Sequence, residues 1–298
     1  MSTSVDVHPK SKINPLESET NAAFGFPRDY LGNRFVYFAI SSRARGLSVG
    51  VNLTPDKRCN FDCVYCEVDR RTPGKSETLD LSVLSAELEA TLASVRDGKL
   101  REHPLYSRVP PDLLRLRHVA ISGDGEPTLC PQFHEAVETV VHVRATSQMG
   151  FFKIVLITNA SNLDDPRVQS GLGLLTPADE VWAKLDVGTQ AYMDSVNRPE
   201  VMLDRILSNI LLVAKQRPVV IQSLFPAVNG CGPSEHEIEQ YALRLKELKD
   251  AGAQISLVQI YSATRPTPNS ECGHLPLRAL SHIAKTVRRL TGLDAQVF

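Results

Sequence analysis

Six short apolar runs, each separated from the next by a stretch with helical periodicity, constrain the fold of this chain more than any other feature. The runs are rich in Val, Ile and Leu, as are strands that are covered on both faces of a sheet. Strands that alternate with helices along a chain form parallel sheets. We therefore predict strands at 47–53, 118–122, 153–158, 180–187, 219–225 and 254–261.

Amphipathic stretches between the runs predict the helices. Apolar residues at helical spacing from Leu84 to Val95 share one face, and Gly98 can end that helix. Ser234 and Glu237 form a capping-box pattern, and the apolar stripe after them predicts another helix. Further helices are predicted at 132–147, 203–216 and 276–290.

The strand–helix alternation suits either a doubly wound α/β sheet or an open barrel. A hydrophobic content of 42% is ample for the core of either fold. Residues 1–30 are polar and lack periodicity, so we predict a loosely ordered N-terminal extension before one domain at 31–298. Both folds place ligand sites at the C-terminal ends of the strands.

Polar residues close several of the apolar runs at that edge. Any one of them could simply mark the exit of a strand into solvent, but the set as a whole predicts one lined cavity. Lys184 and Asp186 are two positions apart, so on a strand they would point to the same face, either as ligand-binding groups or as an internal salt bridge. The residues of the set are Ser122, Thr158, Asn159, Lys184, Asp186, Gln222, Ser223, Gln259 and Tyr261.

Three cysteines, Cys59, Cys63 and Cys66, lie in one short loop directly after the first predicted strand. Three thiolates this close can hold three corners of an iron–sulfur cubane. Because most such clusters take four cysteines, three would leave one iron open to bind a molecule from outside the protein. Zinc is the competing interpretation, although its structural sites are closed by four ligands. A disulfide fits three thiols in one loop poorly.

A glycine-rich turn follows the second predicted strand. Gly123 and Gly125 lack Cβ atoms, so a ligand could approach the backbone closely there, beside Asp124 and Glu126. Alone, such a turn is a weak signal, because many glycine-rich turns have no ligand. Its position one strand after the cysteine loop strengthens it.

The Cys-x3-Cys-x2-Cys spacing, with the aromatic Tyr65 before the last cysteine, resembles the signature of the radical S-adenosylmethionine superfamily. This resemblance implies a partial (β/α)6 TIM-like barrel of parallel strands and a 4Fe-4S cluster on Cys59, Cys63 and Cys66. The open iron would bind the amino and carboxylate groups of S-adenosyl-L-methionine. Reductive cleavage would then give a 5′-deoxyadenosyl radical that abstracts hydrogen from an unidentified substrate.

The resemblance also implies a set of cofactor-binding residues. The turn looks like the Gly-Gly-Glu motif of the superfamily, which holds the methionine amino group, with the departure that Asp124 separates the two glycines. Polar strand ends would bind the ribose and the methionine carboxylate, and other residues would pack near the adenine. The implied residues are Tyr65, Gly123, Asp124, Gly125, Glu126, Asn159, Lys184, Asp186, Gln222 and Tyr261.

A narrower likeness covers most of the chain from Phe35 to Leu290. It is similar to the iron–sulfur oxidoreductases that are often labelled wyosine-synthase-like, whose namesake rebuilds a guanine of transfer RNA. The fold and cofactor of that branch transfer to this chain, whereas a substrate does not, because function belongs to sites rather than folds. The matching segments are 41–55, 60–67, 122–129, 157–160 and 181–189.

The function predicted is therefore a radical S-adenosylmethionine enzyme with an unknown substrate. A transfer-RNA-modifying enzyme is an alternative, but the net charge of −1 does not indicate a strong polyanion binder. A zinc-binding module without catalysis and a pure electron-transfer protein are alternatives from other classes. The absence of a secretory signal and of a long apolar run predicts a cytoplasmic chain without a membrane span.

Two further groups of residues remain open to interpretation. The scattered Cys130, Cys231 and Cys272 match no ferredoxin pattern and read as inert thiols rather than as a second cluster. A cationic group near the cysteine loop could dock an acidic electron donor such as flavodoxin or ferredoxin, bind a phosphate-bearing substrate, or be a solvated surface. It comprises Arg43, Arg45, Arg58, Arg70, Arg71 and Lys75, and Arg265 would lie at the barrel mouth.

Overall fold

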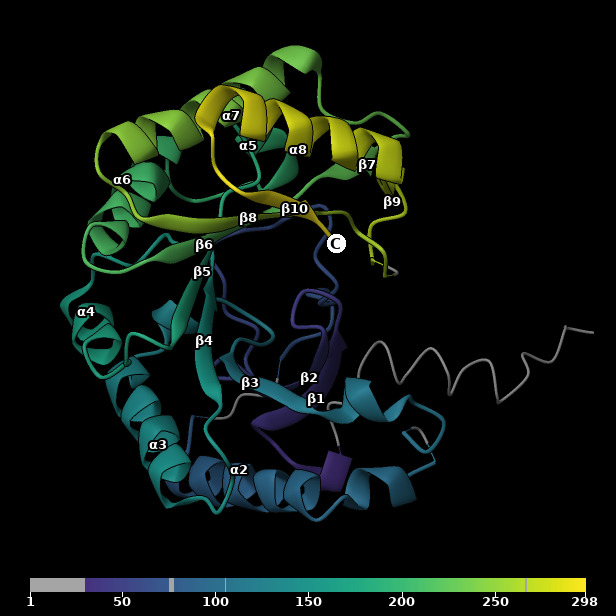
Figure 1. The fold of residues 1–298 in the computed structure, drawn as a ribbon, viewed down its shortest axis with the longest axis vertical. Helices are drawn as coiled ribbons and strands as arrows, with labels where there is room; N and C mark the ends of the chain where they lie inside the picture. The colour runs from purple at the N-terminus through teal and green to yellow at the C-terminus, as the bar shows by residue number, and fades with distance from the viewer. Residues whose placement is uncertain (1–29, 75–77, 105, 266) are drawn as a thin grey trace, which may run out of the picture.

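A computed structural model of the chain describes residues 30–298, except 75–77, 105 and 266 (Figure 1). The predicted extension at 1–30 therefore lies, but for its last residue, outside the described residues. The same is true of Lys75 in the predicted cationic group.

One curved sheet of eight strands organises these residues (Figure 1). Its spatial order is the order of the chain, and every neighbouring pair is parallel except the first two strands, which are antiparallel. The strands are β1 (Val36–Ser41), β2 (Gly46–Val51), β3 (Leu116–Ile121), β4 (Lys153–Thr158), β5 (Glu180–Lys184), β6 (Val219–Leu224), β8 (Ile255–Tyr261) and β10 (Ala295–Val297).

Helices cover the convex face of this sheet and leave its concave face toward the barrel interior (Figure 1). They are α2 (Leu81–Arg96), α3 (Phe133–Thr146), α4 (Pro166–Leu172), α5 (Gln190–Val196), α6 (Leu203–Ala214), α7 (Glu235–Asp250) and α8 (Leu277–Thr291). The main core lies between sheet and helices, and a smaller apolar cluster around Val155, Trp182 and Val220 fills part of the interior. The predicted partial TIM-like barrel is confirmed.

Local sequence signals explain where the predicted helices begin and end. Helix α2 is capped by Asp80, whose side chain accepts hydrogen bonds from two backbone N–H groups, and Gly98 follows its end with φ 72°. The capping box of α7 is only half formed. Ser234 accepts from the Glu237 N–H, but the Glu237 carboxylate turns away and accepts from the N–H of Gly188.

Elements that the periodicity did not predict lie at the edges of the fold. Strands β1 and β10 flank the sheet, and a two-stranded ribbon pairs β7 (Pro226–Val228) with β9 (Cys272–His274). The short helices α4 and α5 were missed, as were four single turns of 3₁₀ helix. Those turns are η1 (Tyr30–Gly32), η2 (Lys99–Glu102), η3 (Pro111–Leu114) and η4 (Pro127–Leu129).

The barrel is open between its two edge strands, β1 and β10, which do not pair with each other in the described part of the chain. We call this opening the seam. The turn between β1 and β2 faces β10 across the seam, where Arg45 Nη2 lies 3.5 Å from Gln296 Oε1. None of the helices in the described residues combines the length and apolarity that a membrane crossing requires.

Candidate functional site

The cysteine loop follows β2 at the C-terminal end of the sheet and is anchored to the segment after α5. The Asp62 and Val64 N–H groups donate to the backbone carbonyls of Asn197 (3.1 Å) and Val196 (2.9 Å). Phe61 and Tyr65 are buried, which fixes the loop against the barrel. The loop is therefore held by its backbone as well as by its apolar side chains, and its three thiols stay together.

Each of the three thiols has an N–H donor of another residue close to its sulfur. Asn159 Nδ2 lies 3.9 Å from Cys59 Sγ, and Asn197 Nδ2 lies 3.5 Å from Cys63 Sγ. Arg70 Nη2 lies 4.0 Å from Cys66 Sγ. Donors of this kind stabilise thiolates and tune the potential of iron–sulfur clusters.

Burial sets the acidity of two of these thiols. It raises the pKa of Cys63 to about 12, and the nearby Asp186 carboxylate acts in the same direction. Burial, followed by the charge of Glu126, also raises the pKa of Cys59. Without a bound cation these thiols would stay protonated at neutral pH, so a positively charged metal centre is needed to hold them as thiolates.

In the described part of the chain, no three His, Cys, Asp or Glu side chains converge in a way that would hold a single metal ion. A cubane does not require such convergence, because each thiolate binds a different iron. The donor set of three loop thiols with adjacent N–H groups fits a cluster of this kind.

The glycine-rich turn packs against the cysteine loop, and its glycines make this close contact possible. A Cβ on Gly123 would overlap the Asn52 side chain, and one on Gly125 would overlap the Arg58 carbonyl. The space on that side of each glycine is thus filled by protein rather than left for a ligand. The two glycines allow the turn to lie directly against β2 and the start of the cysteine loop.

Glu126 links the ends of two neighbouring strands and is 3% exposed. Its Oε1 accepts hydrogen bonds from the Thr128 and Thr158 hydroxyls, both at 2.6 Å, and its Oε2 accepts from the Asn159 N–H at 2.7 Å. Burial raises the pKa of Glu126, and these hydrogen bonds oppose that shift. Through Asn159, the carboxylate also fixes the amide that faces Cys59.

Asp186, two residues beyond the end of β5, accepts hydrogen bonds from four donors. Its Oδ1 lies 3.3 Å from Lys184 Nζ and accepts from the Leu224 N–H at 2.8 Å. Its Oδ2 accepts from the Tyr65 hydroxyl and, at 2.9 Å, from Asn197 Nδ2. The internal salt bridge that the sequence left open is therefore present, and Asp186 connects it to the cysteine loop.

Asn197 is the site residue that sequence reasoning missed. It forms the C-terminal cap of α5, a short helix that the periodicity did not predict. Its amide contacts Tyr65, Cys63 and Asp186 together. No motif or strand end contains it, so the sequence carried no signal for it.

Lys184 lies between two aromatic rings inside the barrel. Its Nζ is 5.1 Å from the ring centroid of Tyr65, 5.6 Å from that of Tyr261 and 3.4 Å from the Tyr261 hydroxyl. Burial acts to lower the pKa of Lys184, but the charge of Asp186 outweighs it, and the pKa is raised. The ammonium therefore stays charged. Gln222, on the next strand, is buried and donates to Gln259 Oε1 at 3.4 Å.

The predicted cationic group divides into two parts. Arg58 and Arg70 lie at the cysteine loop and donate to the backbone carbonyls of Leu129 (2.7 Å) and Lys57 (3.2 Å), and Arg71 pairs with Asp69 there. Arg43 and Arg45 instead lie at the seam. Arg265 Nη1 pairs with Glu67 Oε2 at 3.1 Å, which ties the loop after β8 to the cysteine loop.

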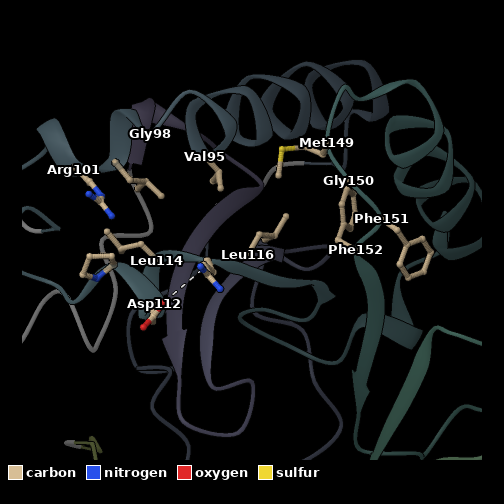
Figure 2. Close-up of a pocket in the computed structure, with 13 residues that line it drawn as sticks. Val95, Gly98, Arg101, Asp112, Leu114, Leu116, Met149, Gly150, Phe151 and Phe152 are labelled. Atoms are coloured by element: carbon tan, nitrogen blue, oxygen red, sulfur yellow. Dashed lines mark ion pairs between the residues drawn. The ribbon is translucent and has the colours of Figure 1, made fainter.

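Three hollows bear on the assignment of the site. A recess of about 350 Å³ opens beside Cys63 and Cys66 and is edged by Arg70, Arg71 and Arg198. A larger one, of about 700 Å³, lies at the N-terminal ends of β3 and β4, away from the cysteine loop (Figure 2). Apolar side chains dominate that larger hollow, so it lacks the chemistry of the first. The third lies at the seam.

The remaining cysteines are dispersed. Cys130 is buried, Cys272 is half-buried on β9 and Cys231 is exposed. Cys231 pairs with Val228 in an isolated β-bridge, and Cys272 pairs with the same residue in the β7–β9 ribbon. Cys130 lies apart from them, at the end of η4. The three thiols do not form one site.

Solved structures of other proteins share the fold of this chain. The chain is similar to TYW1 with a lysine-pyruvate adduct bound (TM-score 0.54, 16% identity, covering 86% of this chain and 84% of that one). It is also similar to Streptococcus suis SuiB bound to S-adenosylmethionine (TM-score 0.56, 14% identity, covering 86% of this chain and 52% of that one). These likenesses confirm the predicted fold.

Two of the sequence relatives carry no activity in their names. A UPF0026 protein of Helicobacter pylori is 24% identical over 271 residues, which cover 85% of this chain and 79% of that protein. A UPF0026 protein of Methanocaldococcus jannaschii is 28% identical over 174 residues, which cover 58% of this chain and 47% of that protein. None of the protein-family models that were searched matches the chain.

Proposed function

We propose that this chain is a radical S-adenosylmethionine enzyme in which Cys59, Cys63 and Cys66 hold a 4Fe-4S cluster with one open iron. The observation that carries the proposal is the pairing of these loop thiols with three separate N–H donors, at the C-terminal end of a barrel with this fold. When bound, the cluster would supply one electron that cleaves S-adenosyl-L-methionine to methionine and a 5′-deoxyadenosyl radical. That radical would abstract a hydrogen atom from a substrate, giving 5′-deoxyadenosine.

The residues around the loop would act by positioning. Asn159, Asn197 and Arg70 would orient the three sulfurs and stabilise their negative charge. Both oxygens of Asp186 already have donors, so we assign it to hold Tyr65 and Asn197 in place rather than to bind the ribose. This assignment replaces the expectation from the resemblance that Asp186 would bind the cofactor directly.

The cofactor would be bound by groups that can still form a hydrogen bond or an ion pair with it. Lys184, charged and with its side chain 17% exposed, suits the methionine carboxylate. Backbone groups of the turn at Gly123, Asp124 and Gly125 suit the amino group, and Gln222 with Tyr261 suits the adenosine. The buried setting of these groups would exclude water from the radical.

An external one-electron donor would reach the cluster at the recess beside Cys63 and Cys66. Arg70, Arg71 and Arg198 edge this recess together with Asp62, Asp69 and Glu271, and the arginines would contact a small acidic protein such as flavodoxin or ferredoxin. Charge reversal at Arg198, Arg198→Glu, should therefore slow cluster reduction by the protein donor while leaving reduction by dithionite unchanged.

Metal analysis and product formation test the proposal together. After anaerobic purification and reconstitution, we expect about four irons and four sulfides per chain, with 5′-deoxyadenosine formed from S-adenosyl-L-methionine under reducing conditions. Cys63→Ala should abolish both, whereas Cys231→Ala, at an exposed thiol, should retain both. Zinc in place of iron, or product formation by Cys63→Ala, would sink the proposal. A salt-sensitive shift of transfer RNA would favour the RNA-modifying alternative.

A further inference from the structure

The seam of the barrel holds a cavity of about 510 Å³ that the cluster chemistry does not use. It runs from the first residues of β3, β4 and β5 to Gln259 on β8, the partner of Gln222. The cavity therefore opens at the seam and ends beside the proposed cofactor residues. A volume of this size suits a small molecule.

The side chains that line this cavity carry an excess of positive charge. Four are cationic, namely Arg43, Arg45, Arg117 and Lys153, and Glu180 is the one acid among them. Lys153 Nζ pairs with Glu180 Oε1 at 2.5 Å, so the three arginines carry the excess. Arg117 Nε donates to the Arg45 carbonyl at 3.0 Å, which holds two of the arginines together.

Arg43 is the most unusual of the three. Its guanidinium lies over the Tyr261 ring, with 4.1 Å between Cζ and the ring centroid. Its Nε is buried and has no hydrogen-bond partner among the residues that the structure describes. A buried donor without an acceptor costs free energy, and a guanidinium presents five donors in a fork that matches carboxylate and phosphate groups.

The wall behind the arginines is largely apolar. Trp182 is 4% exposed, donates to Glu180 Oε2 at 2.8 Å and meets the His118 ring edge-on at 5.3 Å. Burial lowers the pKa of His118 to about 4, so this ring is neutral at pH 7. Val220 and Leu257 complete the wall. It would accept the uncharged part of a ligand.

We propose that this cavity binds the substrate of the enzyme, and that the substrate is a small molecule with a phosphate or carboxylate group. The anionic group lies at Arg43, Arg45 and Arg117, and the remainder lies against Trp182. Because Tyr261 touches both Arg43 and Lys184, the anionic end of the substrate lies at the edge of the cofactor site. This inference rests on the proposed function, which supplies the reaction but not the substrate class.

Trp182 is the single tryptophan of the chain, so its fluorescence reports on this cavity. We would titrate the full chain with phenyl phosphate, benzoate and neutral benzyl alcohol. The expected result is a saturable change with one or both anions at a stoichiometry of one, and no saturation with the alcohol. The anion that binds more tightly identifies the group recognised. Equal binding of the alcohol, or no saturable change with either anion, would overturn the inference.

Matched variants locate the binding. Arg43→Gln and Arg117→Gln should each weaken anion binding by roughly tenfold, because each removes a charge-assisted hydrogen-bond donor. Arg167→Gln, at an exposed arginine of α4 that pairs with Asp165, should leave the affinity unchanged. Circular dichroism checks that the variants fold, and Arg45→Gln serves if either fails. Unchanged affinity in all the seam variants that fold would refute the assignment.

The titration needs neither cluster nor S-adenosyl-L-methionine, so its failure is separable from failure of the proposed function. A chain that forms 5′-deoxyadenosine but binds neither anion contradicts the substrate class alone. A chain that binds an anion through Arg43 but assembles no cluster contradicts the proposed function and leaves the cavity as an anion site.

Discussion

Replacement of Asp186 by asparagine tests whether one buried carboxylate holds the cysteine loop to the barrel. Asp186 is 3% exposed and pairs with Lys184, whose side chain is 17% exposed. Asp186→Asn removes the charge and leaves the ammonium without its anion in a largely dry site. Breaking a buried pair in this way costs about 3–5 kcal/mol. The amide NH2 of the new asparagine would also face at least one of the groups that donated a hydrogen bond to the carboxylate, and that hydrogen bond would be lost.

The assay is urea unfolding of the cluster-free chain at pH 7 under reducing conditions. We expect the free energy of unfolding to fall by about 3–5 kcal/mol in Asp186→Asn. Lys184→Met added to that variant should restore part of the loss, because it removes the unpaired ammonium. Asp250→Asn is the control. It breaks an exposed pair with Lys246 on α7 and should cost about 0.5 kcal/mol or less.

Two results would refute this reasoning. One is a loss in Asp186→Asn no larger than that in Asp250→Asn, which would mean that the buried pair contributes nothing. The other is a double variant, with Lys184→Met, that is no more stable than Asp186→Asn alone. In that case the ammonium was not the source of the cost.

Three further predictions follow from particular contacts. Gly125→Ala should destabilise the chain by about 1–3 kcal/mol, because the added Cβ would overlap a backbone carbonyl. Gly150→Ala is the control and should be neutral, because the space around Gly150 is open. Equal urea midpoints for the two variants would contradict this prediction. Asn197→Leu should make the cluster's reduction potential more negative in a redox titration, because a donor to a thiolate is lost. Arg144 pairs at 2.5 Å with buried Asp179. Burial acts to raise the pKa of Asp179, but the hydrogen bonds that its carboxylate accepts, with that from Arg144 the largest, together outweigh burial, and the pKa is lowered. The ionised Asp179 therefore stabilises the fold above about pH 4, and this stabilisation is lost as the pH falls through the lowered pKa. Asp179→Asn should therefore flatten the acid limb of the stability curve measured by urea unfolding.

Much of the fold could be predicted from the sequence because the inner strands are uniformly apolar. Strand β4 has the predicted bounds, 153–158, and the other inner strands differ by a few residues at their ends. The edge strands β1 and β10 were missed. Strand β1 pairs antiparallel with β2, and no helix separates the two strands, so the strand–helix alternation does not reveal it. Strand β10 has three residues, which are too few to show a period.

The candidate site was predictable where residues are close in sequence and not where they meet only in space. The three cysteines and the glycine-rich turn were found by spacing. Asn197 was assigned no role at the site, because tertiary packing alone brings it to Cys63. Arg43 was grouped with the cationic residues near the cysteine loop, whereas it lies over Tyr261 at the seam. The glycines of the turn also allow the neighbouring loop to approach closely, which their spacing did not indicate.

The central claim is that three thiolates leave one iron of a cluster open to S-adenosyl-L-methionine. Electron paramagnetic resonance of the reduced, reconstituted chain tests it most directly. Addition of S-adenosyl-L-methionine should change the spectrum of the reduced cluster, because the cofactor binds an iron atom itself. A cluster whose spectrum is the same with and without S-adenosyl-L-methionine would contradict the account.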